Sequence, residues 1–373
     1  MKKLLYCMVV LATFAFYGCG NSQSGKIDYL PVKSGYNTYS LFDNQGNVIC
    51  RNQFRGCPTA VVDGMFALKT GGEYQICRVK KDSFKVVRDK LSMAGIPNYG
   101  LVPVLDHHGY IKIIDKNGHI AFRINKDIFM IEPGFHHGHI AYLQTVDGQL
   151  YAGAMNTKGK VVIEPKYASL YIYGEDLFLV QDKDGDAYYF INAKGKKQTQ
   201  WRTDLTYNNV ETYNEVALVP SPYVLGFDEN HHNILFDKKG NVVCDFPERV
   251  KSIYRIKNDL VIYMTKPGMD ALCGVMRLDG SDVVPPLYRY DHLLITDQGI
   301  FAASENESYK YDFSGNRFPT DWKYEWGIRD IDGFGLIGKT GTIYDGDMRP
   351  VSPGINELEW RTRIYMQYIK ATH

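Results

Sequence analysis

The sequence lacks the features that would assign it to several large classes of protein. Lys and Arg number 43 and Asp and Glu 42 among 373 residues, so no excess of positive charge draws the chain to nucleic acid. After the N-terminus, no apolar segment reaches the roughly 18 residues of a membrane-spanning helix. Apolar runs with helical period are also scarce, which argues against a helical bundle. Hydrophobic residues still make up 45%, which excludes wholesale disorder.

Familiar catalytic motifs are scarce as well. The chain has no G-x-S-x-G, no H-E-x-x-H and no C-x-x-C, and the acidic pair Glu357 and Glu359 stands alone near the C-terminus. The sequence therefore names no catalytic residue and implies no cofactor. It favours a protein that is not an enzyme.

The N-terminus has the pattern of a targeting segment. Lys2 and Lys3 precede an apolar run, Leu4–Phe16, that only Thr13 interrupts. Thirteen residues are too few to cross a bilayer permanently, which takes about 20, but they suit the core of a signal peptide. We therefore predict a lipoprotein signal peptide over residues 1–18.

Gly18-Cys19 resembles the lipobox of bacterial lipoproteins, in which a small residue precedes a lipidated cysteine. The resemblance implies a lipid on Cys19, a flexible tether over residues 19–27 and attachment to the cell envelope. No acidic run follows Cys19, which favours an outer-membrane anchor facing the periplasm. The alternative is an ordinary secretory signal in which Cys19 has no role.

Five cysteines remain beyond Cys19, an odd number that cannot pair completely. Cys50 and Cys57 are close in sequence and could form a disulfide bond, a question the sequence leaves open. The other three lie within or beside apolar stretches and are predicted to be small buried side chains. They are Cys77, Cys244 and Cys273.

A short pattern recurs along the chain: an apolar residue, Asp or Asn, two mostly polar residues, Gly, one residue, and an apolar or β-branched pair. The clearest copies are Phe42–Ile49, Ile114–Ile120, Met155–Val162 and Phe236–Val243. Weaker copies end at Gly195, Gly280, Gly315 and Gly341, and a degenerate one is Val79–Ser83. Successive copies are 26 to 45 residues apart.

The physical content of this pattern is a tight hairpin. The Asp or Asn side chain accepts backbone N–H groups two residues on, and Gly takes a positive φ at no steric cost. Alternating runs such as Tyr110–Ile114 flank it, and further turn signals such as Val146–Gln149 supply more hairpins. Each unit of about 40 residues therefore offers three to four short antiparallel strands.

The unit resembles the WG repeat, a β-repeat family that occurs in bacterial lipoproteins. The fullest matches are Ala152–Tyr167 and Cys273–Tyr288, each with Gly, a turn, two or three apolar residues, Pro and Tyr in order. Phe334–Gly341 matches the first half, and the resemblance spans roughly residues 36–345. The signature Trp of the family is absent, and Trp326-Gly327 is out of register.

We predict an all-β fold in which residues 28–373 form one domain, a repeat array of hairpins closed as a seven- or eight-bladed β-propeller. The alternative is an open β-solenoid. The alternating residues 360–368 suggest a last strand that completes the blade begun near residues 36–41. Residues 201–232 are interpreted as a long insertion.

Two other clusters deserve a chemical interpretation. His136, His137 and His139 are weak candidates for metal ligands, and the pairs at residues 107–108 and 231–232 resemble them. All three clusters lie beside Gly or Asn, so we interpret them as exposed turns and predict no metal. Asp182–Asp186 resembles the start of a calcium loop but lacks the Gly and Glu spacing, and is predicted to be a hairpin.

The leading hypothesis is a membrane-anchored, non-enzymatic β-repeat protein that presents an interaction surface to protein partners in the cell envelope. One alternative is a glycan-binding lipoprotein that uses some of the 28 tyrosines. Another is a propeller enzyme whose active site is assembled from dispersed loops. Nucleic acid is not expected as a partner.

Overall fold

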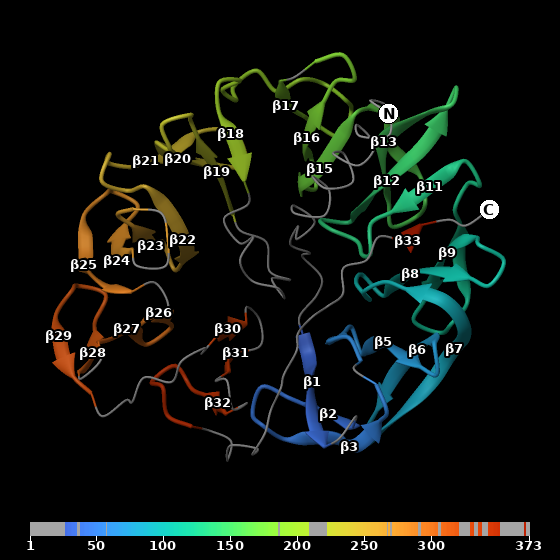
Figure 1. Ribbon diagram of the computed structural model, residues 1–373, viewed down its shortest axis with the longest axis horizontal. Coiled ribbons are helices and arrows are strands. Elements are labelled where there is room, and N and C mark those ends of the chain that lie inside the picture. Colours follow the sequence, from blue (N-terminus) through green and yellow to red (C-terminus); the bar gives the residue numbers. More distant parts are fainter. Residues whose placement is uncertain are drawn as a thin grey trace.

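Short antiparallel strands make up the regular structure of the chain, here a computed structural model (Figure 1). Within Ile27–Lys370, the residues that the structure does not describe are 36–37, 57, 186, 209–221, 267, 269–270, 290–291, 305–306, 321–328, 332–334, 338–341 and 351–368. The described residues contain no α-helix, and so no helix long and apolar enough to cross a bilayer. The predicted all-β fold is confirmed.

The first sheet is the largest and holds ten strands, in the spatial order β10-β9-β8-β7-β6-β5-β4-β1-β2-β3. Its strands are β1 (Ile27–Gly35), β2 (Thr38–Phe42), β3 (Val48–Phe54), β4 (Val61–Val62), β5 (Met65–Thr70), β6 (Glu73–Lys80), β7 (Ser83–Ala94), β8 (Leu101–Asp106), β9 (Ile111–Asp115) and β10 (Ile120–Arg123). The strand β7 is shared: Ser83–Leu91 pairs with β6, and Leu91–Ala94 pairs with β8. It therefore ends one group of hairpins and begins the next.

The other sheets have three to five strands each, nearly all consecutive in the chain. The second contains β11 (Ile128–Ile131), β12 (His139–Val146), β13 (Gln149–Asn156), β14 (Val161–Tyr167) and β33 (Ile369–Lys370), and the third contains β15 (Ser169–Gly174), β16 (Leu177–Gln181) and β17 (Tyr188–Ile191). The fourth contains β18 (Thr206–Asn208), β19 (Tyr223–Phe227), β20 (Asn233–Asp237) and β21 (Val242–Asp245).

Three more sheets complete the described chain. The fifth contains β22 (Ser252–Lys257), β23 (Leu260–Met264), β24 (Leu272–Arg277) and β25 (Asp282–Arg289). The sixth contains β26 (Leu293–Thr296), β27 (Gly299–Ala303), β28 (Ser308–Tyr311) and β29 (Arg317–Pro319), and the last contains β30 (Arg329–Ile331), β31 (Gly335–Ile337) and β32 (Ile343–Tyr344).

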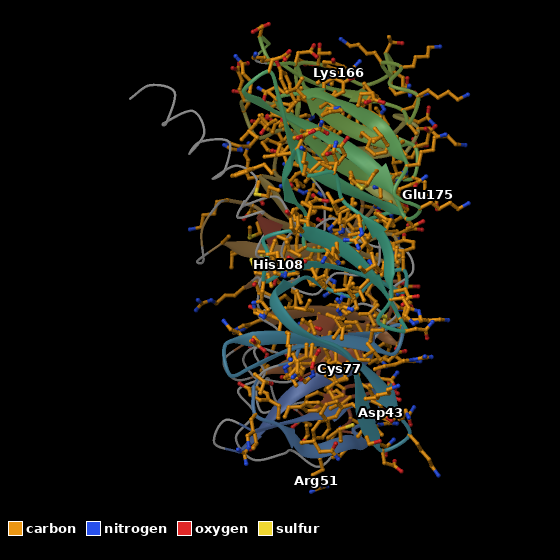
Figure 2. The ribbon with its side chains drawn as sticks, turned by 90° about the vertical axis from the view of Figure 1, so that its right-hand side faces the viewer. Asp43, Arg51, Cys77, His108, Lys166 and Glu175 are labelled. Atoms are coloured by element: carbon orange, nitrogen blue, oxygen red, sulfur yellow. The ribbon has the colours of Figure 1, made fainter. Side chains whose placement is uncertain are left out.

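These sheets follow one another around a ring in chain order (Figure 1). Seen from its side, the ring is a flat disc, with His108 toward one flat face and Glu175 and Asp43 toward the other (Figure 2). Radial repetition of small antiparallel sheets is the β-propeller architecture, whereas a solenoid would stack its units along a line. The described strands make seven sheets. The ten-stranded sheet runs through three successive groups of hairpins, which are β1–β3, β4–β7 and β7–β10.

The hydrophobic core lies between successive sheets and continues from one to the next. Leu41, Phe66 and Cys77 pack between the first two groups of hairpins, and Phe190, Trp201 and Phe236 pack further around the ring. The ring centroids of Phe190 and Trp201 are 4.2 Å apart. A single group cannot bury both of its faces, so each depends on its neighbours for stability.

The turn predicted from the repeated pattern is present at every clear copy. In the first, Asp43 Oδ1 accepts the backbone N–H groups of Gln45 at 2.9 Å and Asn47 at 2.8 Å, and Gly46 has φ 79°. The same two bonds recur at six further turns that contain glycine, opened by Asp106, Asp115, Asn156, Asn192, Asp237 and Asp312. The predicted hairpin mechanism is confirmed there.

Two copies of this turn escaped the sequence pattern because they lack glycine. His231 (φ 59°) and Met348 (φ 62°) occupy the left-handed position in turns opened by Asp228 and Asp345. The degenerate copy Val79–Ser83 is instead a two-residue hairpin in which Lys80 pairs with Ser83. The copy ending at Gly341 lies outside the described residues.

The glycine of the repeat also allows neighbouring groups to approach closely. A Cβ atom on Gly118 would lie 2.0 Å from the carbonyl oxygen of Val87 on β7, and one on Gly159 would lie 2.6 Å from the ring of Phe122. At Gly315 it would lie 2.9 Å from the carbonyl oxygen of Val283. At these three positions the turn therefore docks onto the preceding group of strands.

The glycines of the two full WG-like matches have a different role. Gly153 pairs across the ladder with Tyr142, and Gly274 pairs with Tyr263. A Cβ on either glycine would lie within 3 Å of the partner's ring. Each tyrosine thus lies flat over a glycine, which is a packing reason for Gly in this part of the motif.

The expected last strand over residues 360–368 lies outside the described residues. The two residues that follow it form β33, which pairs with β11, Met130 opposite Lys370. Ile369 is fully buried there, because it fills a core between two sheets. The interpretation of residues 201–232 as one insertion was wrong, since β18 and β19 within them pair antiparallel in the fourth sheet; residues 209–221 between them lie outside the described residues.

Candidate functional site

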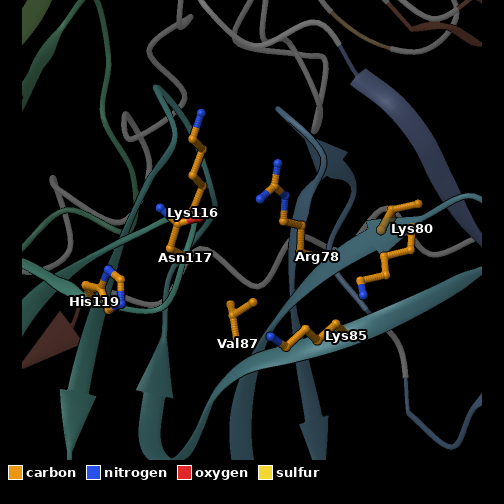
Figure 3. A pocket seen from close by; sticks show the side chains of 8 residues that line it. Arg78, Lys80, Lys85, Val87, Lys116, Asn117 and His119 are labelled. Atoms are coloured by element: carbon orange, nitrogen blue, oxygen red, sulfur yellow. The ribbon is translucent and has the colours of Figure 1, made fainter.

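A pocket of about 530 Å³ lies where two neighbouring groups of hairpins meet (Figure 3). Its residues come from the β6–β7 hairpin and from the turn between β9 and β10. The lining consists of Arg78, Val79, Lys80, Lys85, Val87, Lys116, Asn117 and His119. We call this feature the basic pocket.

Local geometry explains why cations converge there. Arg78 opposes Lys85 across the β6–β7 ladder, so both strands bring basic side chains to this end of the hairpin. Across the gap, the Asp115 carboxylate accepts the N–H groups of Asn117 and His119, which shapes the turn that presents Lys116. Gly118 anchors this turn against Val87. The pocket therefore depends on the contact between the two groups.

The lining of the basic pocket carries positive charge only. Its lining has one Arg and three Lys and no Asp or Glu. All four cationic side chains are exposed, and none forms an ion pair or side-chain hydrogen bond with another residue in the described ranges. Val79 and Val87 are half-buried and give the pocket an apolar floor. Such a site favours a ligand with several negative charges.

Catalysis has little support in this pocket. His119 Nδ1 lies 3.7 Å from Asp115 Oδ2, but the imidazole side chain is 78% exposed and that carboxylate already holds the turn. The lining has no Ser, Cys, Asp or Glu to act as a nucleophile. It also contains no Phe, Tyr or Trp ring on which a sugar could stack.

The candidate metal ligands His136, His137 and His139 lie in and beside a two-residue left-handed turn formed by His137 (φ 49°) and Gly138 (φ 75°). Contrary to our interpretation, the cluster is not an exposed turn: His137 is buried, and burial lowers the pKa of its imidazole to about 3. His139 Nδ1 lies 2.9 Å from the carbonyl oxygen of His137. Within the described ranges, no three His, Cys, Asp or Glu side chains are placed to hold a metal ion.

The carboxylate of Glu132 is buried close to that turn in the chain. Its Oε2 accepts the backbone N–H of Ala141 at 3.1 Å, and burial raises the pKa of Glu132 to about 7. No sequence signal had marked this residue. Its perturbed pKa reflects a structural position between β11 and β12.

The remaining histidine pairs are parts of turns, as predicted. His107 Nε2 lies 3.2 Å from Glu73 Oε1, and His232 Nε2 lies 2.6 Å from Asp245 Oδ1. In the segment that resembled a calcium loop, Gly185 N–H donates to the carbonyl oxygen of Asp182 at 3.3 Å. That bond closes the expected hairpin.

Four cysteines, Cys50, Cys77, Cys244 and Cys273, are buried free thiols. Burial raises the pKa of the Cys77 thiol to about 12, so it is inert as a nucleophile. Cys19, Cys57, Glu357 and Glu359 lie outside the described residues.

One motif match went unnoticed in the sequence. Gly333–Thr340 has the G-x-x-x-x-G-K-T spacing of a phosphate-binding loop, which requires a strand before it and a helix after it. Here Gly335–Ile337 is itself the strand β31, paired with β30 and with β32. A strand inside the motif is incompatible with a phosphate-cradling loop, so the match carries no function.

Comparisons with known proteins identify no family, since no family model and no curated protein matches the chain. Solved structures that resemble it include the C-terminal WD40 domain of Sif2 (13% identity, 83% of this chain and 92% of that chain, TM-score 0.36). Another is Hsv2p of Kluyveromyces lactis, with 10% identity over 66% of this chain and 89% of that chain and a TM-score of 0.36. A third is BamB from Moraxella catarrhalis, with 13% identity over 63% of this chain and 93% of that chain and a TM-score of 0.23.

Proposed function

We propose that this chain is a lipid-anchored, non-enzymatic β-repeat protein of the WG type that presents an interaction surface to protein partners in the cell envelope. In this proposal the basic pocket is the part of that surface that holds an anionic group. The ring is the scaffold that fixes the pocket in place.

The all-positive lining of the basic pocket is the observation that carries the proposal. Four cations that line one pocket repel one another, and a bound anion relieves that repulsion. Such a lining of amines, a guanidinium group, an amide, an imidazole and valines can bind and orient an anion, and it has no Ser, Cys, Asp or Glu to act as a nucleophile. Recognition therefore fits the geometry better than catalysis.

The lipid anchor is the second part of the proposal, and the residues before Ile27 support it through their sequence alone. A short basic stretch, a 13-residue apolar core and Gly18-Cys19 occur in the order a lipoprotein signal requires. Radioactive palmitate should label the native protein and not the Cys19→Ser variant. Equal labelling of both would contradict the anchor.

Photocrosslinking tests recognition at the pocket. A photoreactive residue replaces Asn117, the third residue of the Asp115 turn, or as the matched control Lys194, the third residue of the Asn192 turn. We expect adducts with envelope components from position 117 only, and their loss when Lys85→Glu and Lys116→Glu are added. Identical adducts from both positions, or none from either, would refute the proposal.

A further inference from the structure

We propose that the basic pocket binds the phosphate-bearing headgroup of an anionic lipid, in the same membrane that holds Cys19. The inference rests on the proposed lipid anchor and names the anionic group that the pocket takes. It follows from where the chain enters the ring, how far the anchor can lie from that entry, and which chemistry the pocket offers.

The described chain enters the ring at the turn of the second group of hairpins. Ile27 on β1 pairs with Val62 on β4, directly before the left-handed turn of Asp63 and Gly64. The carboxylate Oδ2 of Asp28 accepts the backbone N–H of Gly64 at 2.7 Å. The first two described residues are therefore fixed to this turn.

The same turn borders the basic pocket. The carbonyl oxygen of Gly64 accepts the backbone N–H of Val79, a residue of the pocket floor, at 2.9 Å. Asp63 belongs to this turn, and burial raises the pKa of its carboxyl group. The positive charge of Lys116 opposes that rise, so Lys116, on the opposite wall of the pocket, is also close to the turn. Chain entry and pocket thus share one edge of the molecule.

The covalent chain limits the distance between that edge and the membrane. Ile27 follows Cys19 by eight residues. Even fully extended, a segment of this length spans at most about 28 Å. A lipid on Cys19 must lie in the bilayer, so the pocket is held within a few nanometres of the headgroups.

The chemistry of the pocket suits a lipid phosphate. Clusters of four or more Lys and Arg next to a membrane anchor bind anionic lipids, and each contributes roughly 1 kcal/mol near the surface. Because the anchor turns headgroup binding into an intramolecular step, even weak contacts are populated. One lipid-modified residue plus a basic patch also gives the two signals that stable attachment needs. The valine floor can contact the glycerol carbons beside the phosphate.

The test uses the mature lipidated protein in nanodiscs made of phosphatidylcholine alone or of an equal mixture with phosphatidylglycerol. Amine acetylation, read by mass spectrometry, reports the accessibility of Lys80, Lys85 and Lys116. Lys194 and Lys196, exposed on the equivalent turn of another group, serve as matched controls. We expect several-fold slower acetylation of the three pocket lysines in the phosphatidylglycerol discs, and no change at the control lysines.

Separate arms identify the source of the anion. Equal acetylation in both kinds of disc, or equal protection of the controls, would overturn the headgroup site. In phosphatidylcholine discs, protection of the pocket lysines by soluble glycerol phosphate would assign the pocket to a free phosphate. Stronger protection by hexaglutamate would assign it to an acidic protein segment. Either result overturns the lipid assignment.

The same spectra show whether Cys19 carries lipid. Its absence would overturn the anchor as well, which is a result distinct from failure of the pocket.

Discussion

The carboxylate Oδ2 of Asp63 accepts a hydrogen bond from the backbone N–H of Gly100, 37 residues further along the chain, at 3.0 Å. Asp28 makes the same bond to Gly64, 36 residues on. In both cases the donor is the glycine of a left-handed turn in the next group of strands. Because the spacing is close to that of the repeat, these bonds join neighbouring groups through the backbone and fix the spacing between their turns.

Replacing Asp63 tests this link. Asp63→Ala should lower the free energy of unfolding by about 2 kcal/mol, since it removes an acceptor and places alanine at φ 53°. Asp63→Asn keeps an acceptor oxygen and tolerates the left-handed conformation, so it should stay within about 0.5 kcal/mol of the native protein. Urea unfolding measures both. Equal stability of the two variants would show that the bond contributes nothing.

The close approach of the repeated turn can be separated from its backbone conformation. Gly118 and Gly280 have φ 86° and 84°, but a Cβ on Gly280 meets nothing within 4 Å, whereas one on Gly118 meets the carbonyl oxygen of Val87. Gly280→Ala should therefore cost only the roughly 1 kcal/mol of a left-handed alanine, and Gly118→Ala should cost about 2 kcal/mol more through overpacking. Thermal and urea unfolding provide the comparison. If the two variants lose the same stability, the turn does not dock as tightly as the structure shows.

Glu132 makes the stability depend on pH. Burial raises the pKa of its carboxyl group to about 7, above the roughly 4.3 expected in the unfolded chain. The folded state therefore binds more protons between these values, and the contribution of Glu132 to stability is present at low pH and lost as pH rises toward 7. Glu132→Gln removes this titration and can still accept the N–H of Ala141.

We therefore expect the Glu132→Gln variant to gain stability relative to the native protein as pH rises from about 5 to 7, by up to roughly 3 kcal/mol. The comparison is made as a difference at each pH because the lowered pKa of His137 acts in the opposite direction: its contribution is lost as pH falls below about 6.5. A pH-independent difference between the two proteins would contradict a buried, titrating Glu132.

Local chemistry made much of the fold predictable. The hydrogen bonds that Asp and Asn make within four residues need no tertiary information, so turns such as the one opened by Asp237 could be placed from the sequence. Turns without glycine could not, because the pattern relies on glycine at the left-handed position, where the structure has His231 and Met348. The partner of β33 was equally inaccessible, since strand pairing over more than 200 residues leaves no local trace.

The candidate site was harder to predict for the same reason. Lys80, Lys85 and Lys116 are ordinary surface lysines in the sequence, and the run of basic residues on β6 and β7 is interrupted by Asp82 and Asp89. Only the docking of the Gly118 turn on β7 brings Lys116 across from the other two. The histidine clusters were conspicuous in the sequence because histidines are adjacent there, but in the structure they belong to turns.

The stability of pocket variants distinguishes a binding site from a structural cluster of charges. If Lys85 and Lys116 exist to hold an anion, their charges repel each other in the free protein, and neither forms an ion pair or a side-chain hydrogen bond within the described chain. Lys85→Gln and Lys116→Gln together should then leave the free energy of unfolding unchanged within about 0.5 kcal/mol, or raise it slightly at low salt, where repulsion is least screened.

Lys112→Gln is the contrasting variant, since Lys112 Nζ pairs with the part-buried Asp106 and its loss should destabilise the fold. Urea unfolding at low and high salt measures all of these. A loss of more than about 1 kcal/mol in the pocket double variant would mean that the lysines support the fold, and the basic pocket would no longer be a candidate for recognition.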